Sequence, residues 1–246
     1  MKTLIIADVH SNLEALVSVI NDAVSRGPIE AVWCLGDVIG YGPDPGPCIS
    51  ILRSAQALIV AGNHDLGAVG AIPLSDFNSS AAEACQWNGD KLSAQEAEFL
   101  KGMPFTIEIE GFTLVHGSPR NPIWEYLISP DLAAANLSHF QTSYCLVGHS
   151  HLPLLFHFED GPSEKCRMAV MKHGDSIKLT DNRVIVNPGS VGQPRDRDPR
   201  AGYAIYDEES RTITHYRVEY DLKTTQEKIR RAGLPEPLAQ RLEYGW

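Results

Sequence analysis

The chain has 246 residues, 43% of them hydrophobic, which is enough to bury a sizeable core, and it carries a formal net charge of −10. This acidic balance argues against a large nucleic-acid footprint and against attraction to an anionic membrane. The five cysteines are scattered and form no Cys-x-x-Cys pair, and no apolar run approaches the ~18 residues of a membrane span. With an N-terminal apolar run too short for a signal peptide, we expect reduced thiols and a cytoplasmic location.

Short apolar runs alternate with helical periodicity in the first half of the chain. Strands are predicted at Leu4–Ala7, Ala31–Leu35 and Ala57–Ala61. Helices are predicted at Asn12–Ser25, with Asn12 as N-cap, and at Cys48–Ser54. Strand, helix and strand in this order indicate a parallel βαβ unit. The Gly- and Pro-rich stretch Val38–Pro47 is a predicted loop.

The second half of the chain is richer in predicted strands. Residues from Pro73 to Gly102 are mainly helical, with Ser75 and Ser93 as caps, and a helix is predicted at Pro130–Phe140. The strands are predicted at Phe105–Glu110, Phe112–Val115, Ser143–Val147, Leu154–Glu159, about Arg167–Lys172, Arg183–Asn187, Tyr203–Asp207 and Thr212–Glu219. The last five are expected to be successive antiparallel strands, and two short helices broken at Gly233–Pro235 are expected to follow.

Five predicted strands end on polar side chains that packing alone does not explain. These are Asp8 and His10, Asp37, Asn63 and His64, His116, and His149 and His151. Ligands of an open α/β sheet bind outside the carboxyl ends of its strands, so we expect these side chains to converge. Imidazole, carboxylate and amide donors without a thiolate favour Mn, Fe, Zn, Ni or Co over Ca or Mg, and they do not select one of the five.

The order of these blocks resembles that of the calcineurin-like metallophosphoesterase superfamily, specifically its small bacterial and archaeal phosphodiesterase-like branch. The match runs from residue 8 to residue 151, and Asn187–Ser190 and Ala232–Pro235 resemble further blocks of that branch. The resemblance implies a four-layer α/β/β/α sandwich of two mixed sheets flanked by helices. We expect one domain over residues 1–246, with a helical tail at about 222–246.

The resemblance also implies a site with two divalent metal ions, for which manganese is the preferred candidate. One ion is assigned to Asp8, His10 and His151, and the second to Asn63, His116 and His149. Asp37 is expected to bridge the two ions, because a carboxylate has two oxygens. A hydroxide between the ions would attack phosphorus, and His64, a histidine outside the ligand set, would protonate the leaving group. Asp65 is predicted either to orient His64 or to cap the following helix.

The substrate contacts are less specific in the sequence. Asn12 and Arg195 are candidate phosphate contacts, although we favour the capping role for Asn12. Tyr41 and Asp44 either line the substrate pocket or form a plain Gly-Pro turn, and we favour the turn. Arg197 and Arg200 alternate with aspartates, as in a solvated loop, and Arg230, Arg231 and Arg241 are expected on a solvated helical face.

The sequence therefore predicts a dimetal phosphoesterase that acts on a small phosphate ester or nucleotide, with phosphodiesters favoured over phosphomonoesters. The alternative is a catalytically silent protein of the same fold that serves as an interaction scaffold. A scaffold would have lost catalytic residues, whereas His64 and all seven predicted ligands are present. The sequence indicates neither the physiological substrate nor the oligomeric state.

Overall fold

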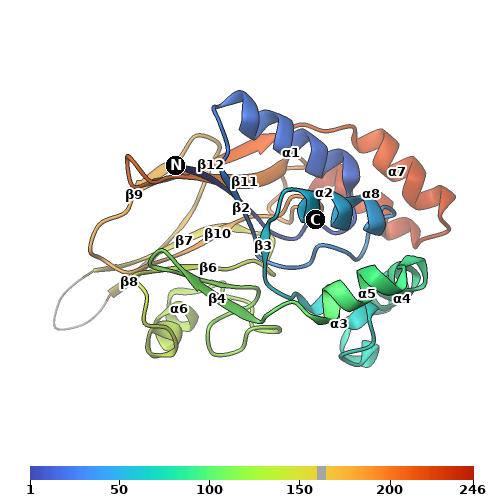
Figure 1. The fold of residues 1–246 in the computed structure, drawn as a ribbon, viewed down its shortest axis with the longest axis horizontal. Helices are drawn as coiled ribbons and strands as arrows, with labels where there is room; N and C mark the ends of the chain where they lie inside the picture. The colour runs from blue at the N-terminus through green and yellow to red at the C-terminus, as the bar shows by residue number, and fades with distance from the viewer. Residues whose placement is uncertain (160–164) are drawn as a thin grey trace.

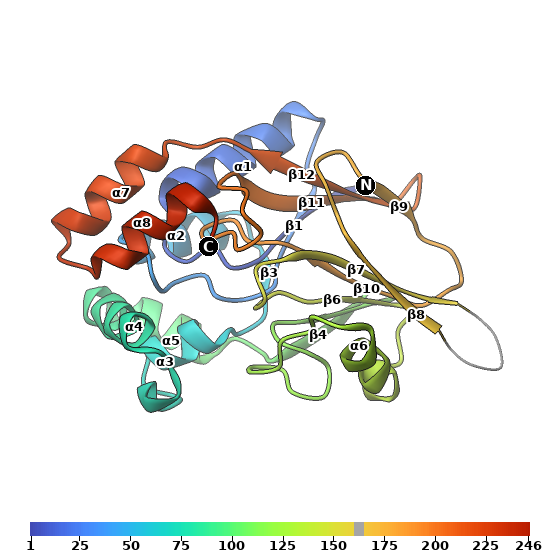
Figure 2. The ribbon, with the colours of Figure 1, turned by 180° about the vertical axis from the view of Figure 1, so that it is seen from behind.

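The computed structural model describes residues 1–159 and 165–246, which form two six-stranded sheets flanked by helices (Figures 1 and 2). The first sheet has the order β3 (Leu58–Ile59), β2 (Ala31–Cys34), β1 (Lys2–Ile6), β11 (Ala201–Asp207), β12 (Thr212–Val218) and β9 (Ser176–Lys178). The second has the order β4 (Thr106–Ile109), β5 (Phe112–Val115), β6 (Tyr144–Leu146), β10 (Val184–Pro188), β7 (Pro153–Glu159) and β8 (Lys165–Val170).

Helices cover the outer faces of both sheets and one end of the sandwich. They are α1 (Leu13–Ser25), α2 (Pro45–Ser54), α3 (Asn63–Ala68), α4 (Ser79–Lys91), α5 (Ala94–Lys101), α6 (Pro130–Asn136), α7 (Leu222–Arg231) and α8 (Glu236–Tyr244), with 3-10 turns at Leu74–Asp76 and Leu137–His139. Helix α1 lies over the first sheet and α6 under the second, so the sheets occupy the middle of the molecule (Figure 1).

Three layers of apolar side chains hold this sandwich together. Trp33 of the first sheet packs on Phe112 of the second in the layer between the sheets. Leu16 of α1 belongs to the layer above the first sheet, and Ala133 of α6 belongs to the layer below the second. Burial of apolar surface on both faces of each sheet is what a four-layer α/β/β/α arrangement requires. The predicted fold is confirmed.

The strands that precede the predicted ligands are parallel within each sheet. Strand β1 pairs in parallel with β2, and β2 with β3, while β5 pairs in parallel with β6 in the second sheet. Their carboxyl ends therefore meet at one end of the sandwich, where both sheets contribute polar side chains. This arrangement gives the site two walls.

Several local predictions need correction. Strand β3 has only two residues, and helix α3 begins directly at Asn63. Helix α4 begins after Asn78, whose side chain caps it, and not after the predicted cap Ser75. Strand β9 was not predicted. The last strands are not simply successive antiparallel neighbours, because β10 pairs with β6 and β7 while β11 pairs with β1 in the other sheet.

The C-terminal tail forms the two expected helices, α7 and α8, and they pack beside the carboxyl end of the first sheet (Figure 2). Ile229 and Leu238 of these helices share a buried cluster with Tyr41 and Ala81. This packing supports the one-domain organisation, which stays a prediction. Among the described residues, no helix combines the length and apolar character needed to cross a bilayer.

Candidate metal centre

The predicted ligands lie directly after their strands, in a backbone conformation that L-amino acids rarely adopt. Five of the seven have positive φ angles: Asp8 (54°), His10 (50°), Asp37 (52°), His149 (64°) and His151 (59°). Each such residue costs roughly 1 kcal/mol or more, and strain of this kind gathers at functional sites. Asp8 and His10 lie beyond the end of β1, so their left-handed backbone conformation, and not the alternation of a strand, sets the direction of their side chains.

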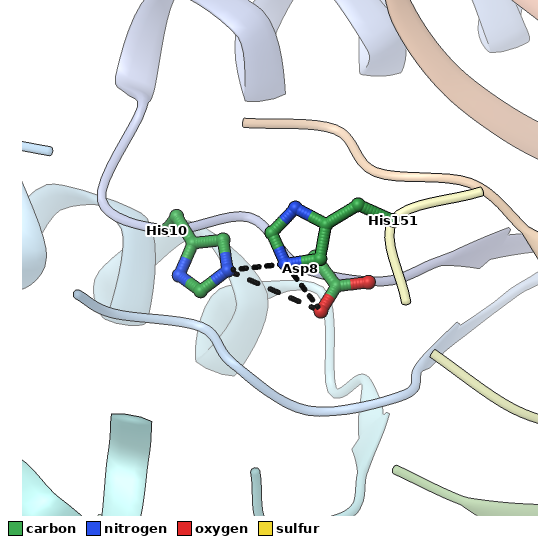
Figure 3. A group of neighbouring side chains, drawn as sticks. All are labelled: Asp8, His10 and His151. Atoms are coloured by element: carbon green, nitrogen blue, oxygen red, sulfur yellow. Dashed lines mark hydrogen bonds and ion pairs between the residues drawn. The ribbon is translucent and has the colours of Figure 1, made fainter. Parts of the chain in front are cut away.

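The first cluster joins the two sheets. Nε2 of His10 lies 3.1 Å from Nε2 of His151, and Asp8 Oδ1 lies 3.4 Å from the same atom of His151 (Figure 3). All three side chains are buried, and their donor atoms lie within 4.8 Å of one another. Atoms that each coordinate one ion at about 2.0–2.2 Å are separated from one another by about the distances seen here, 3.1 and 3.4 Å, so these three residues fit a common metal ion.

The second cluster shares a carboxylate with the first. Nε2 of His116 lies 3.2 Å from Nδ1 of His149 and 3.1 Å from Oδ1 of Asn63. Asp37 Oδ2 lies 3.3 Å from Nε2 of His116 and 3.6 Å from Nε2 of His10, which belongs to the first cluster. One carboxylate oxygen thus stands between the two groups, where a bridging ligand would be needed.

The hydrogen bonds of the imidazoles show why the donor atoms face one another. Nδ1 of His10 donates to the Ile39 carbonyl, Nδ1 of His151 to the Gln193 carbonyl, and Nδ1 of His116 to the Leu35 carbonyl. In a neutral ring the proton on Nδ1 leaves a lone pair on Nε2. In the His10–His151 pair, lone pairs then face each other at 3.1 Å, which is unfavourable unless a cation lies between them.

Burial and charge adjust the ionisation of this cluster in the metal-free chain. Burial lowers the pKa of His149 to about 3, and it lowers the pKa values of His10 and His151 well below the usual range. These rings are therefore neutral at pH 7 and ready to act as ligands. Burial also opposes charge on His116, but the Asp37 carboxylate outweighs it and raises the His116 pKa to about 9. His116 therefore carries a proton on Nε2 in the metal-free chain, and a metal ion bound at this nitrogen would displace that proton.

Two glycines make room for the cluster. A Cβ on Gly62 would lie 2.1 Å from Asp37 Oδ1, and a Cβ on Gly40 would lie 2.4 Å from Nδ1 of His64. Gly62 has an ordinary extended backbone, so it is required by the close approach of Asp37 and not by its own conformation. Gly40, with φ of 105°, is required on both grounds.

Neighbouring polar groups hold these strained turns in place. Ser190 Oγ donates to the Asp8 carbonyl, and Asn187 Nδ2 donates to the Gly148 carbonyl, so the Asn187–Ser190 turn supports both sides of the first cluster. Asp65 Oδ2 accepts from the Gly62 amide and its Oδ1 accepts from the Ile39 amide. Asp65 thus takes the capping role at the start of α3. It makes no hydrogen bond to His64 in the described chain, and its catalytic assignment stays a prediction.

His64 lies beside the clusters at the wall of a small pocket. Its Nδ1 is buried without a hydrogen-bond partner among the described residues, and its ring contacts Tyr41 with centroids 4.4 Å apart. Burial lowers the pKa of His64 to about 4. The pocket is lined by Asp37, Tyr41, Asn63, His64, Asp76, Phe77, Asn78, Ala81, Trp124, Tyr126, His149, His151 and Arg195.

Aromatic side chains that the sequence analysis did not single out form the rim of this pocket. The Tyr126 ring stacks on His149 with centroids 3.9 Å apart, and Trp124 contacts Phe77 at 5.2 Å. Trp124 and Tyr126 follow the candidate ligand His116 by only eight and ten residues, but they belong to no motif. Their place in the pocket depends on the fold.

The remaining predicted contacts divide in two. Arg195 and Tyr41 line the pocket. The turn that we favoured for Tyr41 is therefore not its only role, and the alternative, that Tyr41 lines the pocket, is confirmed. Asp44 instead pairs with Lys228 at 2.9 Å. Asn12 Oδ1 accepts from the Ala15 amide, which confirms the cap, and Asn12 does not line the pocket. A substrate contact by Asn12 stays a prediction.

The arginines outside the ligand set also behave differently from one another. Arg200 pairs with Asp198 at 2.6 Å, as expected of a solvated loop, and the exposed Arg230 pairs with Glu236 at 2.9 Å. Arg241 is not on a solvated face, contrary to our expectation. It is half-buried, and its guanidinium lies 5.8 Å from the Tyr41 ring centroid.

A four-layer sandwich with two imidazole–carboxylate groups around one shared aspartate defines a class of proteins built to hold paired metal ions. The chain belongs to the calcineurin-like phosphoesterase superfamily, whose domain model matches residues 1–211. Members of this family depend on two metal ions, and the buried oxygens Asp8 Oδ2 and Asp37 Oδ2, which accept no hydrogen bond in the described chain, fit that requirement.

Relatives in other organisms extend this finding over the whole chain. An uncharacterized protein of Methanocaldococcus jannaschii is 40% identical over 98% of this chain and 97% of its own length. The crystal structure of a metallophosphoesterase from Sphaerobacter thermophilus has a TM-score of 0.90 and 40% identity, and the match covers 100% of both chains. A hypothetical protein of Pyrococcus horikoshii OT3 has the same fold, with a TM-score of 0.81, 21% identity, and coverage of 100% of this chain and 98% of its own.

Proposed function

We propose that this protein is a dimetal phosphoesterase that hydrolyses small phosphate esters, with phosphodiesters preferred over phosphomonoesters. The observation that carries the proposal is the Asp37 carboxylate between two clusters of buried, lone-pair-bearing donors. Asp8, His10 and His151 would hold one ion, and Asn63, His116 and His149 the other. Manganese is the preferred ion, and this donor set also suits Fe, Zn, Ni or Co.

Bound ions would polarise the phosphoryl oxygens and lower the pKa of a coordinated water. The chain itself supplies the rest of the chemistry. Arg195 Nη2 lies at the pocket wall, held by the Tyr41 hydroxyl at 3.2 Å and by Gln193 Oε1 at 3.0 Å, and would orient a non-bridging phosphate oxygen. The rim of Phe77, Trp124 and Tyr126 restricts the access of water to the pocket.

His64 would act as the general acid that protonates the leaving oxygen. Its unpartnered Nδ1 belongs to a residue of the pocket wall, and Phe77 and Tyr41 pack against its ring. The low pKa of His64 describes the chain without substrate. An anionic phosphate beside the ring favours the imidazolium and raises that pKa, so substrate binding would favour the protonated form of His64 that acts as the acid. General-acid catalysis of this kind contributes roughly 100- to 10,000-fold.

The scaffold alternative has less support, because the chain retains all seven candidate ligands and His64, and one pocket is lined by Asp37, Asn63, His64, His149 and His151. A cytoplasmic location is part of the proposal and draws on the thiols. All five cysteines are free, and four of them are buried. Such thiols suit a reducing compartment.

The test is hydrolysis of bis-p-nitrophenyl phosphate and p-nitrophenyl phosphate by chelated protein, by protein reloaded with Mn²⁺, and by the Asp37→Ala variant. We expect activity that Mn²⁺ restores, that Asp37→Ala lacks, and that is greater on the diester. A reloaded protein that binds two ions but hydrolyses neither ester with Mn, Fe, Ni or Co would favour the scaffold alternative. A greater rate on the monoester would reverse the substrate preference.

A further inference from the structure

Two arginines from distant parts of the chain meet at the edge of the pocket. Arg195 follows strand β10 and Arg241 lies in α8, yet the guanidinium carbon of each is 5.8 Å from the centroid of the Tyr41 ring. Arg241 is half-buried, and Nε of Arg195 is buried without a hydrogen-bond partner in the described chain. This is a concentration of positive charge in a protein with a net charge of −10.

Carboxylates offset this charge only in part. Neighbouring arginines are ion-paired: Arg200 with Asp198, and Arg217 with Asp196. Neither Arg195 nor Arg241 has an ion pair with an aspartate or glutamate side chain among residues 1–159 and 165–246. Arg195 feels the charge of Asp8 only through space, and Nε of Arg241 donates to the terminal oxygen of Trp246. Burial and the charge of Arg195 both lower the pKa of Arg241. Two partly buried like charges are unfavourable unless an anion lies between or beside them.

The position of the pair separates it from the metal centre. Arg195 lines the pocket over the clusters, whereas Arg241 lines a second groove, formed mainly by α8 and the start of α4. Asn78 lines both, so the two spaces adjoin. The pocket has a free volume of about 70 Å³ and the groove about 500 Å³. The pocket holds only a few water-sized groups, so most of any substrate must lie outside it.

The groove also presents aromatic surface. Tyr244 and Trp246 are 51% and 59% exposed, and their rings lie 5.0 Å apart with a 30° tilt. Aromatic side chains that remain in solvent beside an arginine form a platform on which a flat heterocycle can stack. A cationic pair near the metal centre and a platform farther out match the order of phosphate and base in a nucleotide.

We propose that this groove is a substrate subsite for a nucleotide that carries at least two phosphates. One phosphate lies over the metal centre, Arg195 and Arg241 bind the next, and the base stacks on Tyr244 and Trp246. This inference rests on the proposed phosphoesterase function and narrows its substrate class. It assigns the C-terminal helix a direct role in substrate binding.

The test uses Mn²⁺-loaded protein at fixed free Mn²⁺, with bis-p-nitrophenyl phosphate as the reporter substrate and ADP or AMP as competitors. ADP, which can reach both arginines, should inhibit more strongly than AMP. Arg241→Gln should weaken inhibition by ADP roughly 10- to 100-fold, the range for a charge-assisted contact, and leave the KM for the reporter within about twofold. Arg231→Gln, which removes an exposed arginine from α7, is the control for net charge and should change neither value.

Pyrophosphate separates the base from the phosphates. Trp246→Ala should weaken inhibition by ADP several-fold and leave inhibition by pyrophosphate unchanged, because stacking contributes only where a base is present. Arg241→Lys should restore part of the ADP inhibition lost in Arg241→Gln, and melting temperatures of all variants show whether they fold.

Two outcomes would overturn the subsite. Equal inhibition by ADP and AMP in the wild type, or an Arg241→Gln variant with an unchanged ADP value, excludes a second-phosphate contact. If Arg241→Gln weakens the binding of the reporter substrate as much as that of ADP, Arg241 contacts the reacting phosphate and the subsite is also excluded. If the wild type hydrolyses no ester, the proposed function fails. Calorimetric titration of the Mn²⁺-loaded protein with ADP and AMP then tests the subsite separately: tighter binding of ADP than of AMP supports it, and equal binding excludes it.

Discussion

The candidate metal centre and the groove beside it are built in different ways. The centre takes its donors from the carboxyl ends of five strands, which the two sheets bring to one end of the sandwich. The groove takes Asn78 from the start of α4 and Arg241 from α8, which no sheet connects. Hydrogen bonds to main-chain carbonyls orient the donors at the strand ends, whereas apolar contacts hold the helices that form the groove. The proposed function assigns chemistry to the first region and substrate choice to the second.

The largest effect should come from breaking the shared element of the centre. Asp37→Ala removes the oxygen between the two clusters, and we expect the loss of both ions and a fall in activity of at least about 1,000-fold, because the attacking water is no longer acidified. Bound metal measured by mass spectrometry checks this. Two ions still bound per chain would contradict the bridging assignment.

His64→Ala should separate chemistry from metal binding. We expect turnover of esters with poorly stabilised leaving groups to fall roughly 100- to 10,000-fold, with a smaller loss for p-nitrophenolate, which leaves without protonation. Metal content should stay at the wild-type level. Equal losses on both kinds of ester would exclude His64 as the general acid, and a loss of metal would make it a ligand.

Gly62→Ala tests how tightly the centre is packed. A Cβ at this position would lie 2.1 Å from Asp37 Oδ1, so the carboxylate or the strand end must move. We expect a loss of stability of about 1–3 kcal/mol and weaker metal binding. Gly102→Ala is the matched control, because its Cβ would lie 3.4 Å from the nearest atom and its backbone is helical. A Gly62→Ala variant with wild-type melting and metal content would show that the centre tolerates displacement.

The smallest effect is expected from Glu125→Gln, which changes a residue between the aromatic side chains at the rim of the pocket. This carboxylate lies between Trp124 and Tyr126 in sequence, pairs with Arg120, and accepts from Ser118 Oγ and Asn136 Nδ2. The bond from Arg120 lowers the Glu125 pKa to about 2. A lowered folded-state pKa stabilises the fold above the unfolded value near 4.3, and this contribution is lost as the pH falls from there toward 2.

Glu125→Gln should therefore cost about 1 kcal/mol at pH 7, and the cost should shrink as the pH falls through 2. Thermal melts between pH 7 and pH 2 measure the difference from wild type. Because Trp124 and Tyr126 line the pocket, KM should rise while kcat changes little. If the difference in melting temperature between wild type and Glu125→Gln stays constant with pH, the ion pair between Arg120 and Glu125 does not stabilise this segment.

The sequence predicted the centre well because its donors follow a repeated local pattern. Each donor or donor pair comes within a few residues of an apolar run, and parallel pairing of such runs places their ends together, so Asp8, Asp37 and His116 could be grouped without coordinates. Helix α1 was predictable for a similar reason, since Asn12 caps it and its apolar residues repeat at helical spacing.

Other features depended on contacts between segments with no shared pattern. Strand β3 is short because the ladder with β2 ends at Ile59, and the Ala61 amide donates to the Pro104 carbonyl, a contact that an apolar run cannot reveal. The role of Gly62 follows from a distance to Asp37 and not from its own conformation. Arg241 has the sequence context of a surface helix, and only the packing of α8 against Tyr41 makes it part of a groove.

The amino-acid sequence by itself determined the alternating strands and helices and the polar residues at five strand ends, because hydrophobic periodicity and the polar ends of strands are local properties of the chain. The resemblance of these blocks to the family supplied the four-layer fold, the seven candidate ligands and the candidate general acid His64. The tertiary structure alone decided which imidazole nitrogens face the centre, through the carbonyls that accept their other protons. It also decided which arginines form ion pairs with aspartate or glutamate side chains, because that depends on which carboxylates the fold brings within reach and which it leaves elsewhere.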